Sequence, residues 1–85
     1  MTLFALRRES GPGLRVGLTV PRALGGAVDR NRIKRRMRAA VAANRAALEG
    51  PIDVVINPKK SVLTAGYQDI LREVERLFAA ARRQK

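Results

Sequence analysis

The sequence predicts an α+β fold, a small sandwich in which two helices cover one face of a mixed β-sheet. Two observations support this prediction. The apolar patterns along the chain follow the order strand, strand, helix, strand, helix, which is typical of such sandwiches. A long helix joins the second and third strands, as in a βαβ crossover. With 85 residues and no linker or repeat, residues 1–85 are expected to form a single domain.

Two short strands open the chain. Residues 2–8 form the first, and the segment Glu-Ser-Gly-Pro-Gly at 9–13 is a turn signal that ends it. Residues 14–20 then alternate between two faces. One face carries Leu14, Val16, Leu18 and Val20, and the other carries Arg15, Gly17 and Thr19. Two strands separated by a tight turn predict a hairpin.

A basic helix begins near Ala27–Arg30, with Asp29 as its cap or first-turn acid. Gly50 and Pro51 are expected to stop it. At about 100° per residue, its apolar residues share a stripe about 100° wide, which should pack on a core. This stripe contains Ile33, Met37, Ala40, Val41, Asn44 and Leu48, whereas Asn31, Lys34, Arg35 and Arg38 occupy the opposite face and Arg32 and Arg36 flank the stripe.

A third strand spans residues 52–56, and a second helix begins at Thr64 or Gly66. The apolar stripe of this helix is the clearest in the chain. It contains Tyr67, Ile70, Leu71, Val74, Leu77, Phe78 and Ala81. Its other side mixes acids and bases, so we expect this helix to be scaffold.

The charge of the chain points to a polyanion. There are 18 Lys and Arg against 7 Asp and Glu, a net charge of +11, which favours a phosphate-rich partner. Six of the nine residues from Arg30 to Arg38 are basic and none is acidic. A solvated helix face normally mixes signs, and like charges four residues apart destabilise the free helix. These residues therefore indicate nucleic-acid binding. Composition alone does not distinguish RNA from DNA.

Several function classes are excluded. The chain has no Cys and no His, which removes disulfide scaffolds, Cys or His metal sites and His-based acid/base chemistry. Glu73 and Glu75 lie two residues apart on a helix and do not face each other. We therefore expect no catalytic residue and no metal ligand. Met1–Leu6 is too short for a signal peptide, and no apolar run of about 20 residues could span a membrane. The expected location is the cytoplasm.

The order of residues around the basic helix resembles that of a known family. Ala27-Val28, Arg30-Asn31-Arg32, Lys34-Arg35-Arg36 and Arg38 are similar to the Arg-Asn-Arg helix of the bacterial ribonuclease P protein subunit. Leu18–Arg22, Gly25, residues 52–56 and the last helix also match the family pattern. The resemblance covers roughly residues 3–83.

This resemblance implies a fold like the second domain of a small-subunit ribosomal protein, with a left-handed βαβ crossover. General topology rules would instead predict a right-handed one. It further implies that a large RNA subunit with bound Mg²⁺ performs catalysis. The protein would bind that RNA and the 5′ leader of precursor tRNA, without an obligate protein partner or a membrane.

The resemblance also assigns residues to these tasks. The expected RNA-facing set is Arg30, Asn31, Arg32, Lys34, Arg35, Arg36 and Arg38, with Arg22 as a further candidate. Arg15, Gly17 and Thr19 would form the leader cleft, where small side chains let an RNA strand come close. Family members usually begin with a further helix that forms one wall of this cleft, so the chain is short at its N-terminus relative to the family.

Three other readings of the basic helix stay open. The first is a generic or ribosomal RNA-binding module with no processing role. A DNA-binding helix is disfavoured because no helix-turn-helix precedes it. A membrane-surface helix is disfavoured because the apolar stripe lacks large aromatics and is needed for the core.

Overall fold

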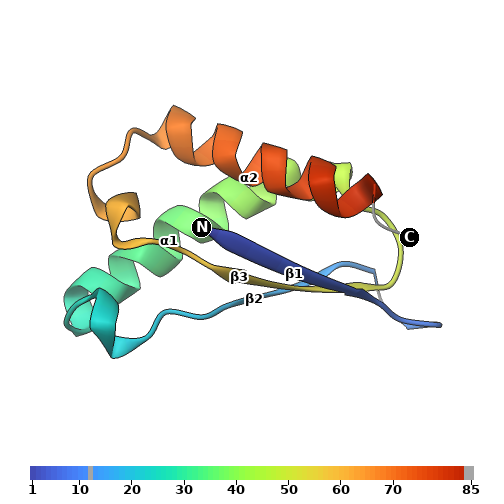
Figure 1. Cartoon of the computed structure of the whole chain (residues 1–85), viewed down its shortest axis with the longest axis horizontal. Helices are drawn as coiled ribbons and strands as arrows, with labels where there is room; N and C mark the ends of the chain where they lie inside the picture. The colour runs from blue at the N-terminus through green and yellow to red at the C-terminus, as the bar shows by residue number, and fades with distance from the viewer. Residues whose placement is uncertain (12, 84–85) are drawn as a thin grey trace.

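The computed structural model describes residues 1–11 and 13–83. The strands are β1 (Thr2–Arg7), β2 (Arg15–Leu18) and β3 (Ile52–Asn57), the helices are α1 (Ala27–Asn44) and α2 (Tyr67–Arg83), and three short 3-10 turns are η1 (Arg22–Leu24), η2 (Arg45–Ala47) and η3 (Lys60–Leu63). Both helices cover the same face of the sheet (Figure 1). The predicted α+β sandwich is confirmed. None of the described helices is long and apolar enough to cross a membrane.

The predicted hairpin is wrong. The strand order is β1-β3-β2, so β1 and β2 lie at opposite edges of the sheet, with β3 antiparallel to β1 and parallel to β2. Ile52, Val54 and Ile56 of β3 are all buried. The central position in the sheet buries these residues most completely, because β3 then has a strand on each side. The connection from β1 to β2 has to cross two strand spacings of nearly 5 Å each. It includes Pro12, which lies outside the described residues.

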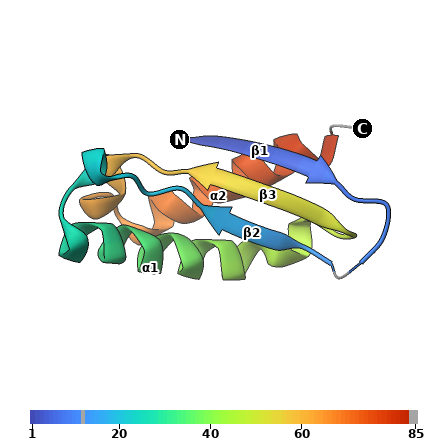
Figure 2. The same ribbon diagram turned by 90° about the horizontal axis from the view of Figure 1, so that it is seen from below.

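The crossover from β2 through α1 to β3 has the rare hand. In Figure 2 the sheet lies in front of the helices, and β2 and β3 point the same way. The chain leaves β2, runs back through α1 on the helix side of the sheet and returns at β3 (Figures 1 and 2). This path is left-handed, whereas about 98% of such crossovers are right-handed.

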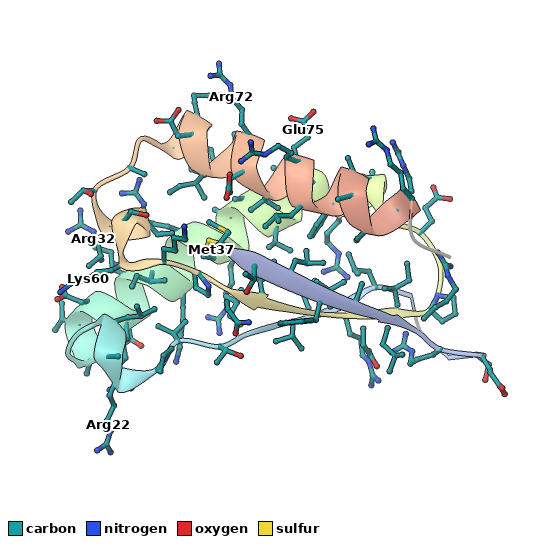
Figure 3. The ribbon with its side chains drawn as sticks, in the orientation of Figure 1. Arg22, Arg32, Met37, Lys60, Arg72 and Glu75 are labelled. Atoms are coloured by element: carbon teal, nitrogen blue, oxygen red, sulfur yellow. The ribbon has the colours of Figure 1, made fainter. Side chains whose placement is uncertain are left out.

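The core lies between the two helices and the sheet. Met37 is fully buried there (Figure 3), as are Ile33 and Ala40 from α1. The helices contribute Ile33, Met37, Ala40 and Val41 from α1 and Ile70, Val74, Phe78 and Ala81 from α2. The even-numbered residues of the segment 14–20 pack against this core, as their alternation predicts. Tyr67 departs from its predicted stripe: it is 43% exposed because it is the first residue of α2.

The helix boundaries differ from the expected ones mainly at the end of α1, while α2 begins one residue after Gly66, at Tyr67. α1 ends at Asn44, well before Gly50. The Asn44 side-chain amide donates to the carbonyls of Ala40 (2.9 Å) and Leu71 (3.3 Å), which fixes the last turn of α1 against α2. Leu48 is buried, but it lies in the segment that follows η2 and not in the helix itself. Asp29 is a first-turn acid, while the cap position is Gly26.

Candidate nucleic-acid interface

The outward face of α1 carries a row of polar and basic side chains that we call the basic rail, made of Asn31, Lys34, Arg35 and Arg38. Asn31, Arg35 and Arg38 are exposed, and Lys34 is half-buried. Together with Val28 they line one shallow hollow of about 470 Å³. The helical period therefore brings these four predicted residues onto one surface.

In the part of the chain that the structure describes, no ion pair neutralises the cations of the rail. Within residues 1–11 and 13–83, the ion pairs involve Arg8, Arg15, Arg76 and the N-terminal amine, and none involves Lys34, Arg35 or Arg38. Three adjacent positive charges on one helix face repel one another in the free protein. A bound polyanion relieves this repulsion and gains three charge-assisted contacts.

The other predicted RNA-facing residues have different surroundings. Arg36 donates to the backbone carbonyl of Ala65, so it ties α1 to the segment before α2. Arg30 is half-buried, and its Nε is enclosed without a partner among the described residues. Arg32 is exposed on the flank of α1 away from the rail, and Arg22 projects from η1 (Figure 3). Helical spacing alone does not reveal the tether of Arg36, because Ala65 lies 29 residues away.

The sheet face opposite the helices is open. Arg15, Gly17 and Thr19 are exposed there, on the face that their alternation predicts. A Cβ added at Gly17 would meet nothing nearer than the Val54 carbonyl oxygen at 4.0 Å, so this part of the face is flat. The three residues predicted for the leader cleft therefore share one accessible surface.

Three apolar side chains on this face were not anticipated. Phe4 is 65% exposed, Leu6 is 69% exposed and Val55 is 41% exposed. Phe4 pairs with Val55, which in turn pairs with Gly17, so these residues form one row across the sheet. Side chains of a strand alternate between its two faces, so residues 2–7 place Phe4 and Leu6 on one face. Which face of this strand the rest of the protein covers depends on its neighbour in the sheet.

Asp53 joins two arginines at one end of the open face. Its Oδ1 accepts from Arg8 Nη1 at 2.7 Å and from Arg15 Nε at 2.8 Å, and its Oδ2 accepts from Arg15 Nη2 at 3.2 Å. The hydrogen bonds from Arg15 are the main reason that the pKa of Asp53 is lowered, with the charges of Arg15 and Arg8 adding to the effect and desolvation opposing it. The same pair raises the pKa of Arg15. The Arg15 guanidinium is thus held in place although its side chain is 61% exposed.

Comparison with known proteins agrees with the fold and the helix pattern. A sequence model described as Ribonuclease P matches residues 1–82. The chain is 40% identical over 74 residues to the ribonuclease P protein component of Streptococcus thermophilus (strain ATCC BAA-491 / LMD-9), covering 87% of this chain and 66% of that protein. It is 46% identical over 61 residues to the ribonuclease P protein component of Maridesulfovibrio salexigens, covering 71% of this chain and 49% of that protein. The chain therefore spans less than two thirds of the length of these relatives.

A solved structure extends the likeness to three dimensions. The Staphylococcus aureus RNase P protein superposes with a TM-score of 0.77 at 21% sequence identity, covering 94% of this chain and 72% of that one. At this identity the superposition establishes a shared fold. The family match, by contrast, extends over nearly the whole sequence and includes the basic helix. The chain belongs to the ribonuclease P protein family.

Proposed function

We propose that this chain acts as the protein subunit of ribonuclease P, binding the catalytic RNA and the 5′ leader of precursor tRNA during 5′ maturation of tRNA. The observation that carries this proposal is the basic rail, whose three cations have no acidic partner within the described residues. The membership of the chain in the ribonuclease P family supports RNA as the polyanion.

The rail suits the backbone of a folded RNA. Arginine can hold a phosphate through two parallel N–H donors, and Lys34 adds a point charge beside Arg35 and Arg38. Asn31 carries both donors and an acceptor at the start of the rail, which suits a base edge or a 2′-hydroxyl. In this proposal the helix supplies affinity through phosphates and limited specificity through Asn31.

The open sheet face suits a single strand such as the leader. Exposed aromatic side chains stack on unpaired bases. Phe4 stands on this face beside Val55, and the flat position Gly17 lies on the other side of Val55. Arg15, fixed by Asp53, supplies a positive charge at one end of the face. Bases would contact the apolar row while the leader phosphates pass Arg15.

Catalysis belongs to the RNA and its Mg²⁺ in this proposal. Two of the acids are already engaged in ion pairs: Asp53 is shared by two arginines, and Glu73 pairs with Arg76 and the N-terminal amine. Within the described ranges no three acidic side chains gather where they could hold a metal. The contribution of the protein is positive charge, which lowers the concentration of Mg²⁺ that the folded RNA needs to bind its substrate.

Competition binding tests whether the RNA partner is specific. We expect the protein to bind ribonuclease P RNA more tightly than an unrelated structured RNA of equal length at physiological ionic strength. Leader contact predicts a second preference, for precursor tRNA over mature tRNA in the complex with the catalytic RNA. Equal affinity for the two structured RNAs would instead identify a generic RNA-binding module.

A further inference from the structure

A groove of about 450 Å³ separates α1 from the outer edge of β2. Its basic side chains are Lys34, Arg38 and Arg45, and no acidic residue of the described ranges lines it. The other residues that line it have apolar or no side chains: Val16, Gly17 and Leu18 from β2, and Val41 and Ala42 from α1. The groove is therefore positively charged, with room for a ligand between α1 and β2.

The backbone of β2 presents free hydrogen-bonding groups to this groove. The Thr19 N–H donates to the carbonyl of Ile56 in β3 at 3.0 Å, so the odd-numbered residues of this segment direct their backbone groups towards β3. Val16 and Leu18 direct theirs the other way, where β2 has no neighbouring strand in the described sheet. Arg45 Nη2 donates to the outward carbonyl of Leu14 at 2.7 Å, which agrees with this parity.

We infer that this groove binds the sugar-phosphate backbone of a single-stranded RNA segment, with phosphates at Lys34 and Arg38 and acceptor atoms at the N–H groups of Val16 and Leu18. The inference rests on the proposed RNA-binding function and extends it to a second surface. Backbone N–H groups and Lys or Arg side chains both commonly contact phosphates, and in this groove they lie on opposite walls.

Two features favour RNA over other acidic ligands. Lys34 and Arg38 line both the groove and the hollow over the basic rail, so an RNA strand on the rail has a continuous path into the groove. Along the helix axis Lys34 and Arg38 are about 6 Å apart, four residues at about 1.5 Å each. The second feature is the volume of the groove, which is that of a small-molecule pocket. A groove of this size admits a short stretch of single strand and not a duplex.

A pair of neighbouring substitutions tests the location. Ala42 and Ala43 are both exposed on α1, but only Ala42 lines the groove. Glu is a good helix former, so Ala42→Glu and Ala43→Glu should both fold and change the net charge equally.

The probe is a fluorescent oligouridylate of about ten nucleotides, within the usual range for single-strand sites. We expect Ala42→Glu to weaken its binding about tenfold, through a like charge placed inside the groove. Ala43→Glu should weaken it less than about threefold, because solvent and salt screen a charge on the other flank. Equal losses in the two variants would overturn the inference.

Amide hydrogen exchange tests the role of the strand edge. Val16 and Leu18 should exchange quickly in the free protein, because their N–H groups have no strand partner. The oligouridylate should slow both, while Thr19 is protected in either state and serves as the internal reference. Unchanged exchange at Val16 and Leu18 under saturating oligouridylate would remove them from the site.

A third measurement separates RNA from an acidic peptide and the groove from the overall function. A polyglutamate peptide of the same length should compete poorly with the oligouridylate, and equal competition would overturn the assignment to RNA. If ribonuclease P RNA binds selectively but Ala42→Glu and Ala43→Glu behave alike, the groove is wrong and the proposed function stands. Loss of selectivity for ribonuclease P RNA in the unmodified protein would instead contradict the proposed function, whatever the groove binds.

Discussion

At the scale of single residues, α1 places opposite environments next to each other. Met37 is fully buried, and Arg38, the next residue, is exposed on the rail. The period of the helix predicts both placements from the sequence alone. Function and stability can therefore be separated on one helix by substituting residues from its two faces.

Met37→Asp should unfold the protein. An uncompensated buried charge costs about 3–5 kcal/mol, a large part of the roughly 5–15 kcal/mol that stabilises a typical domain, and 85 residues bury a limited core. Met37→Leu conserves volume and should cost less than about 1.5 kcal/mol. Thermal melts followed by circular dichroism compare the two variants. A cooperative melt of Met37→Asp near the temperature of the unmodified protein would contradict the placement of this residue in the core.

Arg35→Ala should weaken binding to ribonuclease P RNA about tenfold, or about 1.4 kcal/mol, without changing the melting temperature. With four to six phosphates engaged, the slope of log affinity against log salt should be roughly −3 to −5. Arg35→Ala should reduce its magnitude by about 1. Arg72→Ala removes an exposed arginine from the outer side of α2 (Figure 3) and is the matched control. Binding that does not depend on salt would contradict the rail.

Residue-level reasoning from sequence stops where a partner is distant in the chain. Arg36 belongs to the basic pattern, yet it contacts the Ala65 carbonyl 29 residues away. Asp53 gave no sign in the sequence that it would join Arg8 and Arg15, because both contacts depend on which strands are neighbours. Spacing gives the face on which a residue lies, whereas long-range pairing decides what it meets there.

At the scale of elements, the sequence predicts the strands and helices well but not the strand order. Alternation in residues 14–20 gives the two faces of β2 correctly. The turn signal at 9–13 suggested pairing of β1 with β2, but β3 lies between them. Local turn chemistry does not include the burial gained by placing β3 at the centre, where Ile52, Val54 and Ile56 are all buried. Likewise, the left-handed crossover follows from family resemblance and opposes the general rule.

Gly17→Val tests the open sheet face without disturbing the sheet. A Cβ at this position has open space, and Val has a higher strand propensity than Gly, so the melting temperature should stay equal or rise. The added bulk should weaken the preference of the holoenzyme for precursor over mature tRNA by about threefold to tenfold, since the leader can no longer approach the flat part of the face. The affinity for ribonuclease P RNA, measured in parallel, should change less than this preference does. An unaltered preference for precursor tRNA would remove Gly17 from the leader contact.

At the scale of the whole molecule, the positive charge is distributed unevenly. Among the described residues the cations of the α1 rail have no ion pair, whereas α2 carries an ion pair between Glu73 and Arg76 and the open face contains the network around Asp53. This network joins the segment after β1 to β2 and β3, which lie side by side in the sheet. Composition predicts the excess of charge, but only the fold shows which cations are neutralised internally and which stay available to a ligand.

The Asp53 network makes stability depend on pH in a defined direction. The pKa of Asp53 in the folded protein lies below its ordinary value of 3.8. The contribution of Asp53 to folding stability is therefore fully present above its ordinary pKa and is lost as the pH falls through its lowered pKa. Asp53→Asn should melt at a lower temperature than the unmodified protein near neutral pH, and the difference should shrink as the pH falls below 3.8. A difference in melting temperature that stays constant across this range would contradict the lowered pKa.

The most direct test of the central claim is cleavage of precursor tRNA by ribonuclease P RNA at a Mg²⁺ concentration too low for the RNA alone. We predict that adding this protein restores accurate 5′ cleavage and that the protein without the RNA cleaves nothing. A variant carrying both Arg35→Ala and Arg38→Ala should need a higher protein concentration for the same rescue. Cleavage at low Mg²⁺ that is unchanged by the unmodified protein would contradict its role as a ribonuclease P subunit.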